Sequence, residues 1–308
     1  MEFVHEAMPA TQGLRVEVQA GASFELLIGL SAAEPDGPGS GELWLHLLGL
    51  ALDAPDDIVG AVRSLDPAEL RRHLVGVHVP AWEQLVGRHA LEATARGDTT
   101  LLDHDRYYAG RARASLERLL PLRPAQTKRH VLETLVRYRD EQLDPTVLEA
   151  LERDASAKRT LAVAPDELIE IATGGYRYEP EPELARVVLV PHAAARPWLL
   201  LCQHLRTRII CYPLAEQHGL EERAVALGRA LADEGRIRML RLLATRDASL
   251  SELAAAAGVA RSTAHHHLGQ LRAAGLVTMH GNARAYWFTL RADGVAAARR
   301  TLGELAAP

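Results

Sequence analysis

The sequence lacks an uninterrupted apolar stretch of the roughly eighteen residues that a helix needs to cross a bilayer. Its first ten residues, MEFVHEAMPA, lack the basic-then-apolar pattern of a secretory signal peptide. We therefore expect a cytoplasmic protein with no membrane partner. The chain also lacks a glycine-rich phosphate loop after a strand, a G-x-S-x-G motif and an H-E-x-x-H motif, so we expect no enzymatic activity.

Lysine is scarce as well, because Lys128 and Lys158 are the only two, and arginine carries nearly all of the positive charge. The net charge of −5 is unevenly distributed along the chain. Residues 221–308 contain 12 arginines and 8 acidic residues, whereas the preceding residues contain 23 basic and 32 acidic ones. This asymmetry indicates a nucleic-acid-binding C-terminal part and an N-terminal part that DNA repels.

The two cysteines, Cys202 and Cys211, lie in β-like runs at residues 198–205 and 207–214 that we expect to form a hairpin. If the chain turns at residues 206–207, the thiols lie directly opposite each other, close enough for a strained, labile disulfide. They are then a possible redox pair. The alternative, which we favour for a cytoplasmic protein, is two reduced thiols that fill an apolar sheet.

The most informative part of the chain is SLSELAAAAGVARSTAHHHLGQLRAAGLV, which spans residues 249–277. Ser249 and Glu252 have the S-x-x-E spacing of a capping box, which opens a first short helix. Gly258 suits the left-handed residue that ends this helix. A second helix is predicted to begin near Arg261 and to stop at Gly275. Two short helices joined by a glycine turn indicate a helix-turn-helix.

At about 100° per residue, this second helix has one buried and one exposed side. Ala264, Leu268 and Leu271 fall on the buried side, and His267 lies near it. The residues predicted to contact DNA fall on the exposed side or at its edge: Arg261, Ser262, Thr263, His265, His266, Gly269 and Arg272. Because arginine, hydroxyl and imidazole groups suit phosphates and base edges, we expect this helix to enter a major groove.

A hairpin is predicted directly after this helix. Residues 277–280 and 285–288 alternate as strands do, and Gly281 and Asn282 between them are typical of a hairpin turn. Arg284 near the tip is predicted to reach a phosphate or a minor groove. Further helices are expected at residues 224–231, 237–243 and 293–305.

These motifs together resemble the ArsR-type winged helix-turn-helix of bacterial repressors, which has a three-helix core and a β-hairpin wing. The resemblance covers residues 221–300 and rests on R-I-R-M-L-R-L-L, S-E-L-A, S-T-x-x-H-H-L and A-G-L-V. It implies a homodimer, paired through its first and last helices, that binds double-stranded DNA at a pseudo-palindromic operator and releases it when an effector binds. One departure is Ala260, which stands where a serine or threonine would cap the recognition helix.

No metal site or cofactor is expected. The helix before the recognition helix has no Cys-x-Cys, and the last helix has no histidine, although many relatives use such residues to bind metals. Residues 265–267 are consecutive histidines that point about 100° apart, so they cannot converge on one ion within one chain. The densest remaining group of potential ligands is best interpreted as a solvated loop: Asp98, Asp103, His104 and Asp105.

The N-terminal part, residues 1–215, is predicted to be a larger, mostly helical α+β domain in front of a DNA-binding domain at residues 216–308. The better helical segments lie at 22–33 and between 42 and 151, and a further helix begins at Pro165. Strands are expected at residues 14–18, 185–190, 198–205 and 207–214, and the first is a candidate to join the sheet of the others. Trp44, Trp82 and Trp198 either line a ligand pocket or, as we favour, fill the core.

The whole layout, with ARPWLLLCQHLRTRIICYPL in front of the DNA-binding module, is similar to regulators of high-GC bacteria whose N-terminal domain has no assigned role. The leading hypothesis is a transcription repressor whose N-terminal domain responds to an effector, for which a small molecule is the candidate. One alternative is an enzyme that uses DNA binding for autoregulation, which the missing catalytic motifs disfavour. The other is a DNA-bound interaction scaffold without a small ligand.

Overall fold

The computed structural model describes residues 14–33, 42–100, 113–215 and 219–306. The chain divides into two compact units. We call residues 17–160 and 188–215 the N-terminal unit, and residues 1–16, 161–187 and 216–308 the C-terminal unit. Within the described residues, no helix is both long and apolar enough to cross a membrane.

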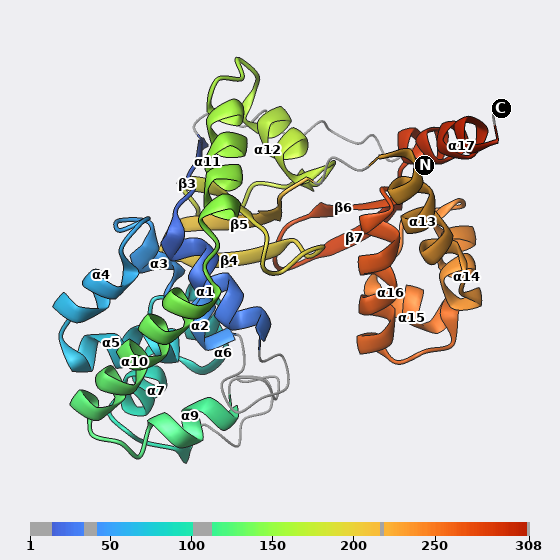
Figure 1. The fold of residues 1–308 in the computed structure, drawn as a ribbon. Helices are drawn as coiled ribbons and strands as arrows, with labels where there is room; N and C mark the ends of the chain where they lie inside the picture. Colours follow the sequence, from blue (N-terminus) through green and yellow to red (C-terminus); the bar gives the residue numbers. More distant parts are fainter. Residues whose placement is uncertain (1–13, 34–41, 101–112, 216–218, 307–308) are drawn as a thin grey trace. The chain divides into compact units, whose positions relative to one another are not determined.

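The N-terminal unit is mostly helical, as predicted (Figure 1). Its described helices are α1 (Ala22–Ala33), α2 (Glu42–Leu45), α3 (Leu48–Ala51), α4 (Ile58–Ser64), α5 (Pro67–Val75), α6 (Pro80–Val86), α7 (Arg88–Ala95), α9 (Arg113–Leu119), α10 (Pro124–Gln142) and α11 (Pro145–Arg159). Helix α1 has the bounds that the sequence predicts. It is buried along most of its length, with Phe24, Leu27 and Ile28 fully inaccessible to solvent.

Helix α5 shows how local sequence sets the ends of these helices. The Asp66 carboxylate accepts hydrogen bonds from the backbone N–H groups of Ala68 and Glu69, and Pro67 occupies the first turn. Gly76 ends the helix in the left-handed conformation, with φ of 85°. The chain therefore reverses sharply after α5, which brings the residues that follow back toward the helix.

A four-stranded sheet runs in the order β1-β3-β5-β4. Its strands are β1 (Arg15–Val18), β3 (Arg186–His192), β4 (Leu200–His204) and β5 (Thr207–Pro213). The predicted recruitment of the first strand into this sheet is confirmed. Val188, Val190, Ile209 and Cys211 from the two central strands are buried in the same hydrophobic core as the residues of α1.

The hairpin of β4 and β5 turns at residues 205–206, one residue earlier than predicted. Cys202 therefore pairs with Ile209 and Cys211 pairs with Leu200, so the prediction that the two thiols lie directly opposite each other is wrong. The thiols are diagonal neighbours on one face of the sheet, and both are free. A hydrogen bond with Cys202, together with burial, raises the pKa of the Cys211 thiol, which keeps it protonated and poorly reactive.

The C-terminal unit contains the predicted winged helix-turn-helix (Figure 1). Its elements after residue 219 are α13 (Leu220–Leu231), α14 (Glu234–Leu243), α15 (Leu250–Ala257), α16 (Arg261–Ala273), β6 (Val277–Gly281), β7 (Tyr286–Leu290) and α17 (Ala292–Leu305). Met239, Leu253, Ala264 and Leu271 are inaccessible to solvent and form the centre of the helical core. The predicted α+β fold with a winged helix-turn-helix behind a larger N-terminal part is therefore confirmed.

Residues 161–187 also belong to this unit, and the helix that was predicted to begin at Pro165 lies within them. The segment contains α12 (Pro165–Thr173) and β2 (Arg177–Tyr178), and β2 pairs in parallel with the wing strand β6. The Tyr176 hydroxyl donates a hydrogen bond of 2.9 Å to the carbonyl oxygen of Gly281. The wing is thus the outer part of a three-stranded sheet, in the order β2-β6-β7.

Candidate functional site

The turn region that presents helix α16 is built by local hydrogen bonds. The Ser249 hydroxyl accepts from the backbone N–H of Glu252, and the Glu252 carboxylate accepts from the backbone N–H of Ser249 at 2.8 Å. This is the predicted capping box. These bonds from Ser249, and an ion pair with Arg246, lower the pKa of Glu252 to about 2. Gly258, with φ of 72°, ends α15 as predicted.

The N-terminal half of α16 carries an exposed polar face. Ala264 and Leu268 are buried on the opposite side, as the helical period predicts. The exposed residues are Arg261, Ser262, Thr263, His265 and His266. Ala260 precedes the helix without a side-chain cap, so no side chain of that residue satisfies the first amide groups. The amide groups and the partial positive charge of the helix terminus therefore add to this face as an anion-binding surface.

Two residues predicted on the exposed side of α16 or at its edge are less accessible than the other five. Gly269 is buried, because a glycine has no side chain that extends beyond its neighbours on the helix. Arg272 donates a hydrogen bond from Nη2 to the carbonyl oxygen of Thr173 at 3.1 Å, and desolvation lowers the pKa of its guanidinium to about 10. Thr173 belongs to the segment at residues 161–187, whose position the period of α16 cannot reveal. The exposed position predicted for Gly269 is therefore wrong, whereas Arg272, predicted at the edge of the exposed side, is partly buried against Thr173.

Arg284 lies on the loop of the wing, as predicted, but its guanidinium has partners within the unit. It forms an ion pair with Glu183, and its Nε lies 4.0 Å from a carboxylate oxygen of Glu181. The side chain remains 56% exposed. A phosphate that approaches Arg284 would therefore compete with these two carboxylates.

His267 supports the helix from behind, in agreement with its predicted position near the buried side. Only 8% of the residue is exposed. Its Nδ1 lies 3.2 Å from Nη1 of Arg236, and its Nε2 lies 3.6 Å from the carboxylate of Asp233. His267 thus ties α16 to the start of α14.

The elements follow one another in the order of a winged helix-turn-helix: α14, α15, a tight turn, the exposed α16 and an antiparallel wing. Residues 233–279 match the model of the arsR family of bacterial regulatory proteins. The arsR match extends from the residue before α14 into the first wing strand. Searches of curated proteins and of solved structures found no significant match to this chain.

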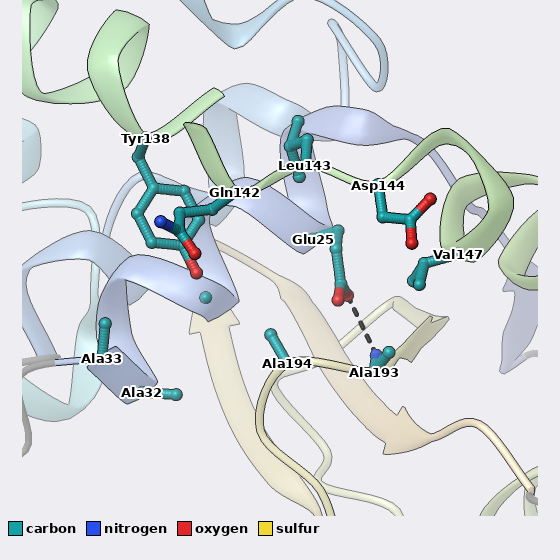
Figure 2. Close-up of a pocket in the computed structure, with 11 residues that line it drawn as sticks. Glu25, Ala32, Ala33, Tyr138, Gln142, Leu143, Asp144, Val147, Ala193 and Ala194 are labelled. Atoms are coloured by element: carbon teal, nitrogen blue, oxygen red, sulfur yellow. Dashed lines mark hydrogen bonds between the residues drawn. The ribbon is translucent and has the colours of Figure 1, made fainter. Parts of the chain in front are cut away.

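Outside the arsR-type region, the N-terminal unit contains a pocket of about 340 Å³ (Figure 2). Glu25 from α1 and Tyr138 and Gln142 from α10 line it, together with Asp144 from the following loop. The Glu25 carboxylate accepts a hydrogen bond of 3.0 Å from the backbone N–H of Ala193. Burial raises the pKa of Glu25 despite this bond.

The tryptophans and the acidic loop of the N-terminal unit were also considered as ligand sites. Trp44 is buried in the hydrophobic core, and Trp82 packs against that core, so for these two the core interpretation is confirmed. Trp198 does not line the pocket of Figure 2.

In the acidic loop, the Asp98 carboxylate accepts hydrogen bonds from the backbone N–H and the hydroxyl of Thr100. The other members of that group, residues 103–105, lie outside the described residues.

Proposed function

We propose that this protein is a sequence-specific transcription repressor that binds a pseudo-palindromic operator as a homodimer and responds to a small-molecule effector. The arsR-type helix-turn-helix supports the coarser conclusion, a DNA-binding transcription regulator. The observation that carries the proposal is the exposed polar face on the N-terminal half of α16, with Arg261 at its start. In a helix-turn-helix, the N-terminal residues of the second helix contact base edges in the major groove.

The chemistry of this face suits the groove. Arg261 can donate several hydrogen bonds and carries a permanent positive charge, so it suits a phosphate or a guanine edge. Ser262, His265 and His266 add side chains that donate and accept hydrogen bonds. The buried residues behind them fix the helix, so that these side chains are presented without rearrangement of the core.

A homodimer is supported by apolar side chains that remain exposed on the first and last helices of the arsR-type region. Val225 on α13 and Leu302 on α17 are each 52% exposed. Helices α13 and α17 pack against each other, and Arg223 forms an ion pair of 3.2 Å with Glu304 across them. A dimer that covers these side chains would bind successive major grooves if its two recognition helices lie about 34 Å apart.

The pocket in the N-terminal unit supports the effector response. Its volume of about 340 Å³ lies at the lower end of the range for small-molecule sites. Glu25, Gln142 and Asp144 offer hydrogen-bond acceptors to a ligand, and Tyr138 offers an aromatic surface. We therefore expect a small effector that presents hydrogen-bond donors.

DNA binding is tested with the full-length protein. Duplexes that the protein selects from a random pool are first sequenced to obtain the operator, and affinities are then measured by fluorescence anisotropy at fixed salt. Arg261→Ala and His266→Ala should each weaken operator binding by about tenfold, as expected for a lost base or phosphate contact. Arg284→Ala should lower affinity with little change in sequence preference.

Arg137→Ala is the matched control, because it removes another exposed arginine, from α10 in the N-terminal unit. It should bind the operator within about twofold of the wild type, since it is outside the arsR-type region. If Arg261→Ala and His266→Ala also bind like the wild type, α16 does not use this face.

A further inference from the structure

A cluster of histidines in the N-terminal unit lies apart from both the pocket and the arsR-type region. Glu69 and His73 lie one turn apart on α5, and His78 follows the glycine turn that ends this helix. Their potential ligand atoms all lie within 4.8 Å of one another. His204, at the end of β4, places its ring centroid 5.8 Å from that of His73 and 5.6 Å from that of His78.

The distances within this cluster suit a metal ion. A tetrahedral ion with bonds of about 2.1 Å holds its ligand atoms about 3.4 Å apart. One oxygen of Glu69 lies 2.9 Å from Nε2 of His78 and 3.8 Å from Nε2 of His73, values on either side of that separation. Small side-chain rotations would therefore bring these three groups to one ion.

The second observation concerns ring nitrogens. Nδ1 of His73 and Nδ1 of His204 are buried and have no hydrogen-bond partner among the described residues. An unsatisfied buried polar atom destabilises a protein by about 1–3 kcal/mol, so such atoms call for an explanation. Hydrogen bonding alone therefore does not account for the packing of these rings, and Nε2, which faces Glu69, is the donor that His73 offers to an ion.

The nearby His46 shows what a purely structural histidine looks like in this unit. Its Nε2 accepts a hydrogen bond of 3.0 Å from the indole N–H of Trp82, and its Nδ1 lies 2.9 Å from the carbonyl oxygen of Leu74. Because an indole nitrogen only donates, the tautomer is fixed and both ring nitrogens are satisfied. His73 and His204 differ from His46 in this respect.

The surroundings of Glu69 orient its carboxylate and leave one oxygen toward the histidines. Arg72 donates to the other oxygen at 2.6 Å, and the same guanidinium forms a two-point ion pair with Glu92. The positive charge of Arg72 is thus shared by two carboxylates. Such secondary bonds fix metal-binding carboxylates in many sites.

We propose that Glu69, His73 and His78 bind one divalent transition-metal ion of the class of Zn²⁺ or Co²⁺. Imidazole and carboxylate together favour these ions over Mg²⁺ or Ca²⁺, which prefer oxygen ligands alone. The site would lie at the end of α5, beside the β4–β5 hairpin that carries His204. These elements already meet at a hydrogen bond of 2.9 Å from the Leu205 N–H to the His78 carbonyl.

The experiment measures metal binding without DNA, so its result is independent of the proposed function. The full-length chain, purified without a polyhistidine tag and treated with a chelator, is titrated with Co²⁺ at constant pH. Visible d–d absorption should grow to one equivalent, and Zn²⁺ should abolish it at one equivalent. Glu69→Gln and His78→Gln should each weaken Co²⁺ binding by at least about tenfold. Their side chains are partly exposed, 30% and 19%, and a thermal scan verifies that the variants fold.

His130→Gln is the control, because it removes an exposed histidine of α10 that is not part of the cluster. It should bind Co²⁺ as the wild type does. The histidines of α16 remain in every variant, so ions held there would bind equally to all of them. A wild-type protein that binds neither ion at one equivalent overturns the proposal, as does Co²⁺ binding that is unchanged in His78→Gln.

Discussion

Single residues in the N-terminal unit have ionisation behaviour that their position in the fold determines. Glu25 is only 6% exposed, and burial raises its pKa, although the Ala193 N–H and the charge of Arg196 act in the opposite direction. A carboxyl group whose pKa is raised by folding stabilises the folded state when it is protonated. This stabilisation is present at a pH below 4.5, the pKa of the Glu25 carboxyl in the unfolded chain. It is lost as the pH rises through the pKa of Glu25 in the folded state.

We predict that Glu25→Gln is more thermally stable than the wild type at pH 7.5. The amide avoids the desolvation of a buried charge, and its oxygen can still accept from the Ala193 N–H. The melting temperature should rise by about 2–4 °C, the shift that about 1 kcal/mol produces in a domain of 150–250 residues. Scanning calorimetry should show that the difference disappears near pH 4.

Glu149→Gln serves as the comparison, since Glu149 is an exposed carboxylate on α11. Its melting temperature should follow that of the wild type at both pH values. A Glu25→Gln protein that is less stable than the wild type at pH 7.5, or equally shifted at both pH values, contradicts the raised pKa.

At the level of single elements, periodicity and capping signals in the sequence correctly predicted the helices and turns that depend only on neighbouring residues. Helix α1, the capping box at Ser249 and the left-handed Gly258 all follow from local chemistry. The exposed position of Arg261 and His266 follows as well, because the apolar side of α16 is well defined. These features were correctly predicted.

The sequence did not predict the contacts between segments that lie far apart in the chain. The register of the cysteines depends on the turn at residues 205–206, and an error of one residue there moves the thiols from opposite to diagonal positions. The partners of Arg272 and Arg284 lie about a hundred residues earlier in the chain, in a segment that no local pattern assigns to the wing. The histidine cluster is another such case, because His204 reaches His73 only through the fold.

The segment at residues 161–187 leads to a prediction about the wing. Glu183 is paired with Arg284, so the guanidinium must leave this carboxylate before it contacts a phosphate. We predict that Glu183→Gln tightens operator binding by about two- to fivefold, because neutralisation of the carboxylate removes a competitor of the DNA backbone. Anisotropy titrations at several salt concentrations should show a steeper dependence on salt than the wild type.

The control for this prediction is Glu167→Gln, which makes the same change of charge at an exposed position of α12. If both variants tighten binding equally, the effect comes from net charge and not from the pair with Arg284. An affinity of Glu183→Gln equal to that of the wild type indicates that Arg284 does not contact DNA.

At the scale of the whole molecule, the two units carry different chemistry. The N-terminal unit contains a polar pocket and a histidine cluster, and the C-terminal unit contains the arsR-type region with its exposed recognition face. A sensor that changes DNA binding must alter either the presentation of one recognition helix or the spacing of two. The second route requires the proposed dimer, for which the exposed apolar residues of α13 and α17 offer a surface.

We predict that Leu302→Asp separates the dimer. Leu302 is 52% exposed, so the substitution should leave the fold of the single chain intact, whereas a carboxylate buried in a dimer interface would be strongly destabilising. Light scattering coupled to size-exclusion chromatography should change from twice the chain mass for the wild type to 33.6 kDa for the variant. Operator affinity should fall at least tenfold, since only one half-site is then held.

The control is Leu161→Asp, at a leucine outside α13 and α17 that is 41% exposed, and this variant should remain dimeric. A wild-type protein of 33.6 kDa at the concentrations that bind DNA would remove the dimer from the proposed function and leave the recognition face to act alone.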